Sequence, residues 1–115
     1  MSDYLVIDNV TIPQGTTFVR RYPVEALGTL FADATAAAQV RASAASVDVL
    51  FSFTVTMVPD PDDPNSGTVQ IACAPAASWG FDWTDGVFDV VVTESDSTKL
   101  RIAQGSVTVN AGVTR

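Results

Sequence analysis

Residues 79–115 read WGFDWTDGVFDVVVTESDSTKLRIAQGSVTVNAGVTR, in which runs of apolar residues alternate with turn-forming residues. Phe88, Val90 and Val92 lie two residues apart, so their side chains share one face of an extended strand. Thr-Asp-Gly at 84–86 predicts a turn before this strand, and the polar run 94–97 predicts another after it, because such side chains can bond their own backbone. This stretch therefore predicts a β-hairpin.

The second strand of this hairpin changes the parity of its apolar residues. Leu100 and Ile102 are at even positions, whereas Val107 and Val109 are at odd ones. A regular strand would expose half of these side chains, because a shift by one residue turns each side chain to the other face. We predict a β-bulge or bend at 104–105, where a glycine tolerates the backbone conformation that a bulge often needs.

Alternating apolar residues predict further strands over 4–12, 18–24, 47–57 and 69–73. The clearest pattern is that of 47–57, where valine, phenylalanine and methionine occupy one face and polar residues the other. Pro23 cannot donate a hydrogen bond to a sheet, so its strand is expected to lie at a sheet edge or to break there. The run 59–67, rich in proline and aspartate, predicts an extended hairpin tip.

Residues 34–45 are rich in alanine and fit two structures. Alanine favours a helix by intrinsic propensity, yet the alternation of Ala36, Ala38, Val40 and Ala42 fits a strand equally well. We favour the strand, because the segments around it are β and a lone short helix is marginally stable.

Seven or so short strands without a helix of ordinary length predict an all-β protein, an antiparallel immunoglobulin-like β-sandwich. At 115 residues the chain is expected to be a single domain, 1–115. It lacks the cysteine pair of antibody domains. The sole cysteine, Cys73, lies in an apolar strand pattern and is expected to be a small buried hydrophobic residue.

Composition argues against several functions. A net charge of -7 with six basic residues disfavours nucleic-acid binding, which requires a concentrated basic surface. The absence of histidine removes Ser-His and Cys-His nucleophile pairs and most zinc sites, so we expect no enzyme and no cofactor. No segment approaches the roughly 20 apolar residues of a membrane span, and no export signal is evident.

The order of these motifs resembles a small immunoglobulin-like domain of structural proteins from tailed bacteriophages and prophages. The resemblance rests on Gln-Gly-Thr-Thr-Phe at 14–18, on the Asp-Ala-Thr turn and the strand ending in arginine within 33–41, and on the hairpin. In the hairpin it covers the aromatic, glycine and aspartate pattern of 83–93, the glycine-interrupted strand 100–109 and the ending Val-Thr-Arg at 113–115.

This resemblance implies a non-enzymatic virion protein that is made in the bacterial host cytoplasm. Its expected partners are other virion proteins and copies of itself, and its expected place is the tail tip or baseplate, where it would act as an adaptor. Capsid decoration remains an alternative location. A second alternative is a module that binds a host-surface glycan or receptor.

Two sets of carboxylates could carry chemistry. The oxygens of Asp60, Asp62, Asp63 and Asn65 are of the kind that Ca²⁺ prefers, but the run lacks the spacing of a known calcium loop, so a solvated acidic turn is favoured. Asp82, Asp85 and Asp89 invite comparison with the paired acids of glycosidases. Turn formation and an exposed strand position explain them better, and Asp89 is expected to pair with Arg101 across the hairpin.

Several apolar residues are candidates for an interface. Large aromatic side chains dominate interface energetics and can stack on sugars, and three of them alternate within five residues. The candidate interface residues are Trp79, Phe81, Trp83, Val107, Val109 and Val113. We also hypothesise that residues 2–10 or 107–115 add as a strand to the sheet of a neighbouring subunit.

Overall fold

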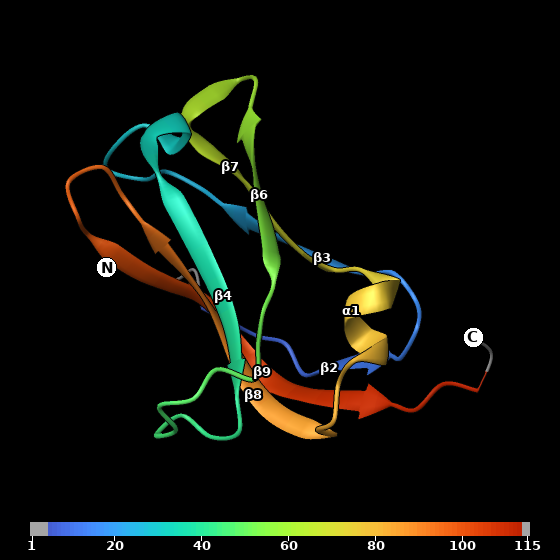
Figure 1. Ribbon diagram of the computed structural model, residues 1–115. Coiled ribbons are helices and arrows are strands. Elements are labelled where there is room, and N and C mark those ends of the chain that lie inside the picture. Colours follow the sequence, from blue (N-terminus) through green and yellow to red (C-terminus); the bar gives the residue numbers. More distant parts are fainter. Residues whose placement is uncertain (1–4, 114–115) are drawn as a thin grey trace.

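The computed structural model describes residues 5–113, which form two β-sheets packed face to face (Figure 1). Sheet A has six strands in the order β1-β9-β8-β4-β5, with β2 also paired to β9, and sheet B has the order β3-β7-β6. The strands of sheet A are β1 (Val6–Ile7), β2 (Val10–Pro13), β4 (Thr35–Arg41), β5 (Phe51–Ser52), β8 (Asp85–Thr93) and β9 (Lys99–Asn110). Those of sheet B are β3 (Phe18–Val24), β6 (Thr54–Asp60) and β7 (Asp63–Cys73). The all-β prediction is confirmed.

The core lies between the sheets and follows the period-2 pattern of the sequence. On β8, Phe88, Val90 and Val92 are all buried, as the hairpin pattern predicts. They belong to one core cluster with buried side chains of sheet B such as Val69 and Ile71 on β7. Each fully buried aliphatic side chain of this kind contributes about 1.5–3 kcal/mol, so the two inner faces hold the sandwich together.

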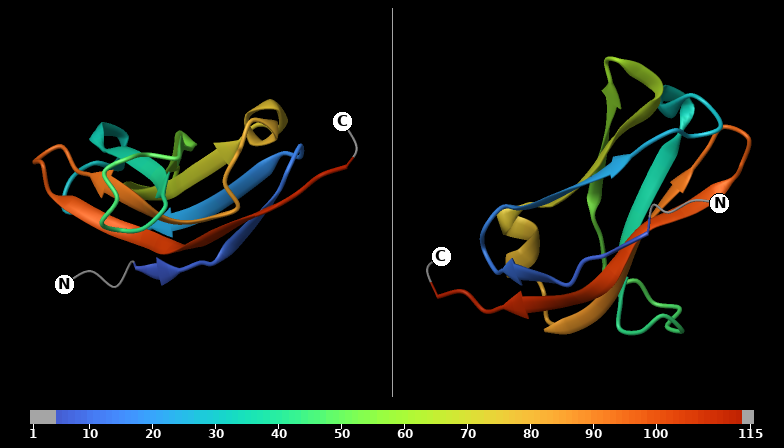
Figure 2. Two further views of the ribbon diagram at one scale, coloured as in Figure 1. Left: turned by 60° about the horizontal axis from the view of Figure 1, so that its bottom comes forward. Right: turned by 180° about the vertical axis from the view of Figure 1, so that it is seen from behind.

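The two packed sheets make the domain a β-sandwich, in which β3, β7 and β6 are neighbours in one sheet and β9, β8 and β4 in the other. The immunoglobulin-like character of this sandwich stays a prediction. The nine strand segments come from seven stretches of chain, because β1 and β2 share one stretch and β5 and β6 share another. The expectation of wholly antiparallel sheets is wrong at one place, since β1 and β2 run parallel to β9 (Figure 2).

The parity change in β9 is resolved by an irregularity two residues before the predicted place. Val90 pairs with Ala103 and Val91 pairs with Arg101, so Ile102 is the extra residue. Ile102 and Ala103 are both buried, which shifts the inward face from even to odd positions. Gly105 serves another purpose, since a Cβ there would lie 2.1 Å from the carbonyl oxygen of Asp8 in the adjoining β1–β2 connection. The strand stays within sheet A throughout.

The predicted continuous strand 47–57 is wrong in its first half. Residues 42–50 form an irregular loop in which Val47 is 86% exposed. The chain then pairs briefly with β4 as β5, crosses between the sheets at the buried Phe53, and continues as β6 in sheet B. Alternation alone predicts which residues share a face, but it cannot show that one run serves two sheets.

The predicted long loop 59–67 is a tight turn. Asp60 pairs with Asp63, so β6 and β7 extend to the tip and leave Pro61 and Asp62 between them. Pro59 fits within β6 because β6 is an edge strand, where a missing backbone N–H costs no ladder bond. The alanine-rich segment forms β4, as predicted, and it ends at Arg41.

Two short helical turns cover the ends of the sandwich. The 3-10 turn η1 (Phe31–Asp33) inserts the fully buried ring of Phe31 above Gly67, where a Cβ would lie 2.5 Å from that ring. The helix α1 (Pro75–Trp79) begins with proline at its first position, where no intrahelical N–H is needed. It closes the opposite end, next to the turn between β2 and β3 (Figure 1).

Candidate interaction surfaces

Two of the three clustered aromatic residues fill the end of the sandwich near α1. The rings of Phe81 and Trp83 are 4.7 Å apart, and Phe81 meets Phe51 edge-on at 5.0 Å. Phe51 in turn contacts the buried Phe53. The Phe81 and Trp83 side chains are half-buried and pack against the core. This contact accounts for their presence, and glycan stacking stays a prediction.

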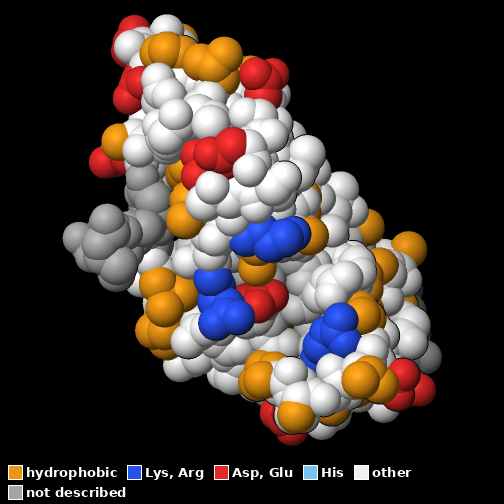
Figure 3. Space-filling view, turned by 90° about the vertical axis from the view of Figure 1, so that its left-hand side faces the viewer, with side chains coloured by type: hydrophobic (Ala, Val, Ile, Leu, Met, Phe, Trp, Pro, Cys, Tyr) orange, Lys and Arg blue, Asp and Glu red, His pale blue; other side chains and the backbone are white. Residues whose placement is uncertain are grey.

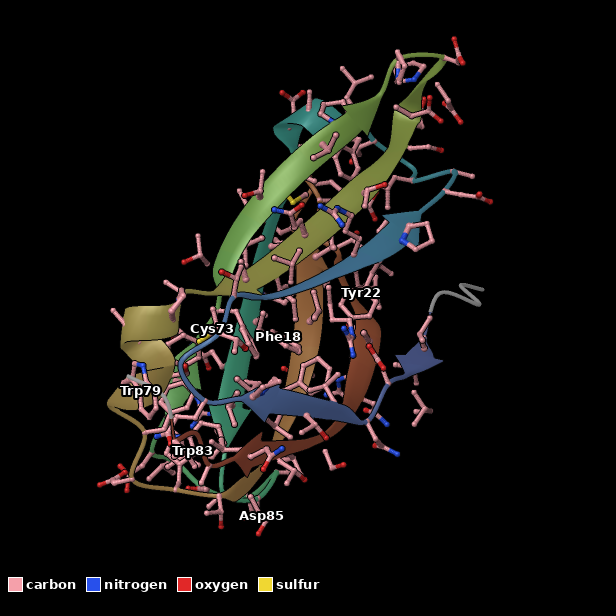
Figure 4. All side chains as sticks on the ribbon, turned by 90° about the vertical axis from the view of Figure 1, so that its right-hand side faces the viewer. Phe18, Tyr22, Cys73, Trp79, Trp83 and Asp85 are labelled. Atoms are coloured by element: carbon pink, nitrogen blue, oxygen red, sulfur yellow. The ribbon has the colours of Figure 1, made fainter. Side chains whose placement is uncertain are left out.

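Trp79 lies on two glycines instead of joining this stack. A Cβ on Gly15 would lie 2.4 Å from the indole, and one on Gly112 would lie 2.8 Å from it. Nearby, Ser78 is fully buried and its Oγ accepts a hydrogen bond of 2.7 Å from the Gly15 backbone N–H. Trp79 and Trp83 are seen at the same end of the molecule in Figure 4, on the two sides of the 80–82 connection. These contacts tie α1 to the β2–β3 turn.

The structure does not gather the candidate calcium ligands around one point. Asp63 accepts hydrogen bonds from the Asn65 backbone N–H at 3.0 Å and from the Ser66 hydroxyl at 2.7 Å. These bonds, the one from Ser66 above all, lower the pKa of Asp63. The Asn65 amide donates to the carbonyls of Leu27 and Thr29, so it anchors the 25–30 loop. Over residues 5–113, no group of three or more His, Cys, Asp or Glu is placed to hold a metal.

The three carboxylates that were compared with the acid pair of glycosidases have different structural roles. Asp85 begins β8 opposite Thr108, so the turn predicted at 84–86 is largely strand instead. Asp89 pairs with Arg101 across the hairpin at 3.2 Å, as predicted. Asp82 belongs to the connection before β8.

The valines proposed as an interface divide into two kinds. Val107 and Val109 are 1% and 7% exposed in the chain's own core, whereas Val113 is 93% exposed. β9 has β8 on one side and β1 with β2 on the other, so the predicted docking edge at 107–110 is wrong. Within the proposed N-terminal segment 2–10, residues 6, 7 and 10 pair with β9 of the same chain, and residues 2–4 lie outside the described residues, as do 114–115.

One edge of sheet B is protected. Its strand β3 carries Arg20, Arg21 and Pro23. Arg20 lies 3.6 Å from the Asp8 carboxylate and 5.1 Å from the centre of the Phe18 ring. Charges and proline on an edge strand hinder pairing with another chain, because an added strand would have to desolvate them or forgo a hydrogen bond.

The same edge is joined to sheet A through a buried tyrosine. The Tyr22 hydroxyl donates a hydrogen bond of 2.8 Å to Asp8 Oδ2, and the Tyr22 side chain is 4% exposed. Burial, followed by this hydrogen bond, raises the pKa of Tyr22 above its ordinary value. Asp8 is in the connection between β1 and β2, so this contact bridges the two sheets.

The other edge of sheet B is open. Among residues 5–113 the only strand paired with β6 is β7, so one side of β6 presents unpaired backbone groups. Its sequence from 54 to 58, Thr-Val-Thr-Met-Val, contains no charge and no proline. Thr54, Thr56 and Val58 are exposed, and such β-branched residues favour strands. Over 54–58 this edge has none of the usual features that prevent strand addition, and such features begin only at Pro59 and Asp60.

A hollow of about 400 Å³ lies on the outer face of sheet A. Side chains from β4, β8, β9 and the 42–50 loop line it, with Ile7 of β1 at one side. Figure 3 shows Lys and Arg side chains gathered on this side of the molecule around an acidic one. Arg41 and Arg101 line the hollow, and Lys99 is on the same face of β9 as Arg101. Three of the five described cations are therefore on this face.

Sequence reasoning missed this hollow and the open β6 edge. Arg41, Asp89 and Arg101 were recognisable as outward-facing by alternation, but their convergence depends on which strands become neighbours. The openness of β6 depends on the crossing at Phe53, which no local pattern marks. Buried Glu94, which accepts two hydrogen bonds from Thr29, also appeared in the sequence as a turn residue.

Models of known protein families and curated protein sequences show no match to this chain. Among the described residues, no helix is long and apolar enough to cross a membrane.

Proposed function

We propose that this protein is a structural subunit of a tailed-phage particle that catalyses no reaction and works through packing and β-edge contacts. The observation that carries the proposal is the open β6 edge, an uncharged run of five residues in a chain with net charge -7. A strand added there gains main-chain hydrogen bonds without burying a charge. The resemblance of its motif order to phage virion domains supports the same function.

β6 is a better contact edge than either edge of sheet A, one of which is β5 with two residues and the other β1 with β2. β1 and β2 are two and four residues long, and Asp8 and Asn9 interrupt them. β6 presents seven residues in one strand. Within the particle we favour an adaptor of the tail tip or baseplate. A capsid decoration protein requires the same properties and is the alternative.

Mass spectrometry of purified particles, followed by the same measurement on separated heads and tails, tests this function. We expect peptides of this protein at a fixed ratio to the tail proteins. Enrichment with heads would instead favour capsid decoration. Absence from washed particles that contain the other structural proteins would overturn the proposal.

A further inference from the structure

We propose that the acidic tip of the β6–β7 hairpin, residues 59–63, docks into the sheet A hollow of a second copy of this chain. The inference goes beyond the proposed function, because it concerns self-association that the isolated protein can display. It rests on the complementary charge and shape of two surfaces that lie on different sheets.

Arg41 is the anchor of the receiving hollow. Its Nη1 donates to the Ser46 carbonyl at 2.9 Å and its Nη2 donates to Gln39 Oε1 at 3.0 Å. Both acceptors are neutral, and no carboxylate within the described chain forms an ion pair with Arg41. A guanidinium has five N–H groups, so three remain for an incoming carboxylate in a side chain that is already held in place.

The neighbouring Arg101 already has a carboxylate partner, so an incoming carboxylate is directed to Arg41. Arg101 lies 3.2 Å from Asp89 and so has a partner of opposite charge. The side chains of Arg101 and Asp89 are substantially exposed, so their ion pair is weak. Because Arg41 and Arg101 face only one carboxylate, Asp89, the hollow has a net positive charge.

Asp62 is the matching group at the tip. It is exposed between Pro61 and Asp63, and its carboxylate accepts no hydrogen bond within residues 5–113. By contrast, Asp60 accepts a bond of 2.9 Å from the Asp62 backbone N–H, and Asp63 is held by Ser66. The tip therefore presents one uncommitted carboxylate on a turn that proline makes rigid.

The two surfaces also match in apolar character and in size. The hollow is flanked by Ile7, which is 63% exposed, and by Val87, which is 36% exposed. The tip carries Pro59 and Pro61 with Val58, which is 48% exposed, just before it. A volume of 400 Å³ holds about a dozen waters, so it suits a protein turn better than a single ion.

Net charge does not prevent this contact. Each copy carries -7, but charges separated by more than about 8 Å are largely screened at physiological salt, so the local pairing decides. Because the tip and the hollow are different surfaces, two copies form a closed dimer if both tips dock reciprocally about a two-fold axis, and otherwise form rings or chains.

Sedimentation velocity of the purified protein tests the proposal with two charge reversals, Arg41→Glu and Asp62→Arg. We expect the wild type to associate at about 150 mM salt, where repulsion between distant charges is screened, and to dissociate at about 500 mM salt, since the contact is electrostatic. Each variant alone should associate at least roughly tenfold more weakly. An equimolar mixture of the two should regain association, because the unchanged tip of one variant then meets the unchanged hollow of the other, and the two reversed surfaces also attract each other.

Asp82→Arg is the matched control for Asp62→Arg, since it changes the net charge by the same amount and sign at a site away from the tip and should leave association unchanged. Asp62→Arg alters an exposed turn, so it keeps the test valid even if Arg41→Glu fails to fold. A wild type that stays monomeric at about 150 mM salt would overturn the inference. So would association that Asp62→Arg leaves intact, which would indicate another surface, such as the β6 edge.

Discussion

The two edge strands of sheet B differ in charge and in their contacts with sheet A. β3 carries two arginines and a proline and is tied to sheet A through Asp8 and Tyr22. β6 carries neither charge nor proline over 54–58, with Pro59 and Asp60 only at its end, and it pairs on one side only within the described chain. Both strands pack their inward side chains against the same core, so packing does not require this difference. We infer that β3 resists the addition of a strand from another chain, whereas β6 permits it.

The largest expected effect on stability comes from removing the hydrogen bond between Tyr22 and Asp8, which joins β3 to sheet A. Asp8→Ala leaves the buried Tyr22 hydroxyl without its acceptor and removes the partner of Arg20. An unsatisfied buried group costs about 1–3 kcal/mol, so the free energy of unfolding should fall by that amount in urea titration. Asp89→Ala, which removes an exposed ion pair, is the control and should cost less than about 1 kcal/mol. Equal losses in both variants would contradict the bridge.

The same bridge predicts a dependence on alkaline pH. The pKa of Tyr22 is raised in the folded state, so folding favours the neutral phenol. This stabilisation is fully present below the unfolded pKa of about 10 and is lost as the pH rises toward the folded-state value. Above about pH 10, the wild type should therefore lose stability more steeply with rising pH than Tyr22→Phe, as followed by thermal unfolding. Parallel curves for the two proteins would show that Tyr22 does not contribute this dependence.

Charging the open edge should affect contacts far more than stability. Thr56→Lys puts an ammonium on an exposed β6 position, where the free energy of unfolding should change by no more than about 0.5 kcal/mol. Incorporation into particles, measured by quantitative mass spectrometry, should drop. Thr108→Lys is the control, since it is exposed on β9, a strand with paired neighbours on both sides. Normal incorporation of Thr56→Lys would rule out β6 as the contact edge.

A small stability change is also expected when the charge and the proline that protect β3 are removed. Arg21→Thr with Pro23→Thr gives β3 the chemistry of β6 at two exposed positions, again within about 0.5 kcal/mol per site. The double variant should form new β-sheet oligomers at high concentration, detected by light scattering and infrared spectroscopy. If it remains as monodisperse as the wild type, these residues do not protect the edge.

The sequence predicted local features well and spatial ones poorly. The β8–β9 hairpin, the strand β4 and the edge position of Pro23 follow from alternation and turn chemistry, which are properties of adjacent residues. The crossing at Phe53 and the parallel pairing of Val10 with Val107 depend on distant parts of the chain. Both candidate contact surfaces depend on such long-range neighbours, which explains why no motif revealed them.

Hydrogen exchange of β6 in the free protein and in the purified particle tests the central claim most directly. We predict that exchange across 54–58 slows in the particle, because an added strand occupies the unpaired backbone groups, while exchange across β3 stays the same. Unchanged exchange at β6 in particles that contain the protein would contradict the account.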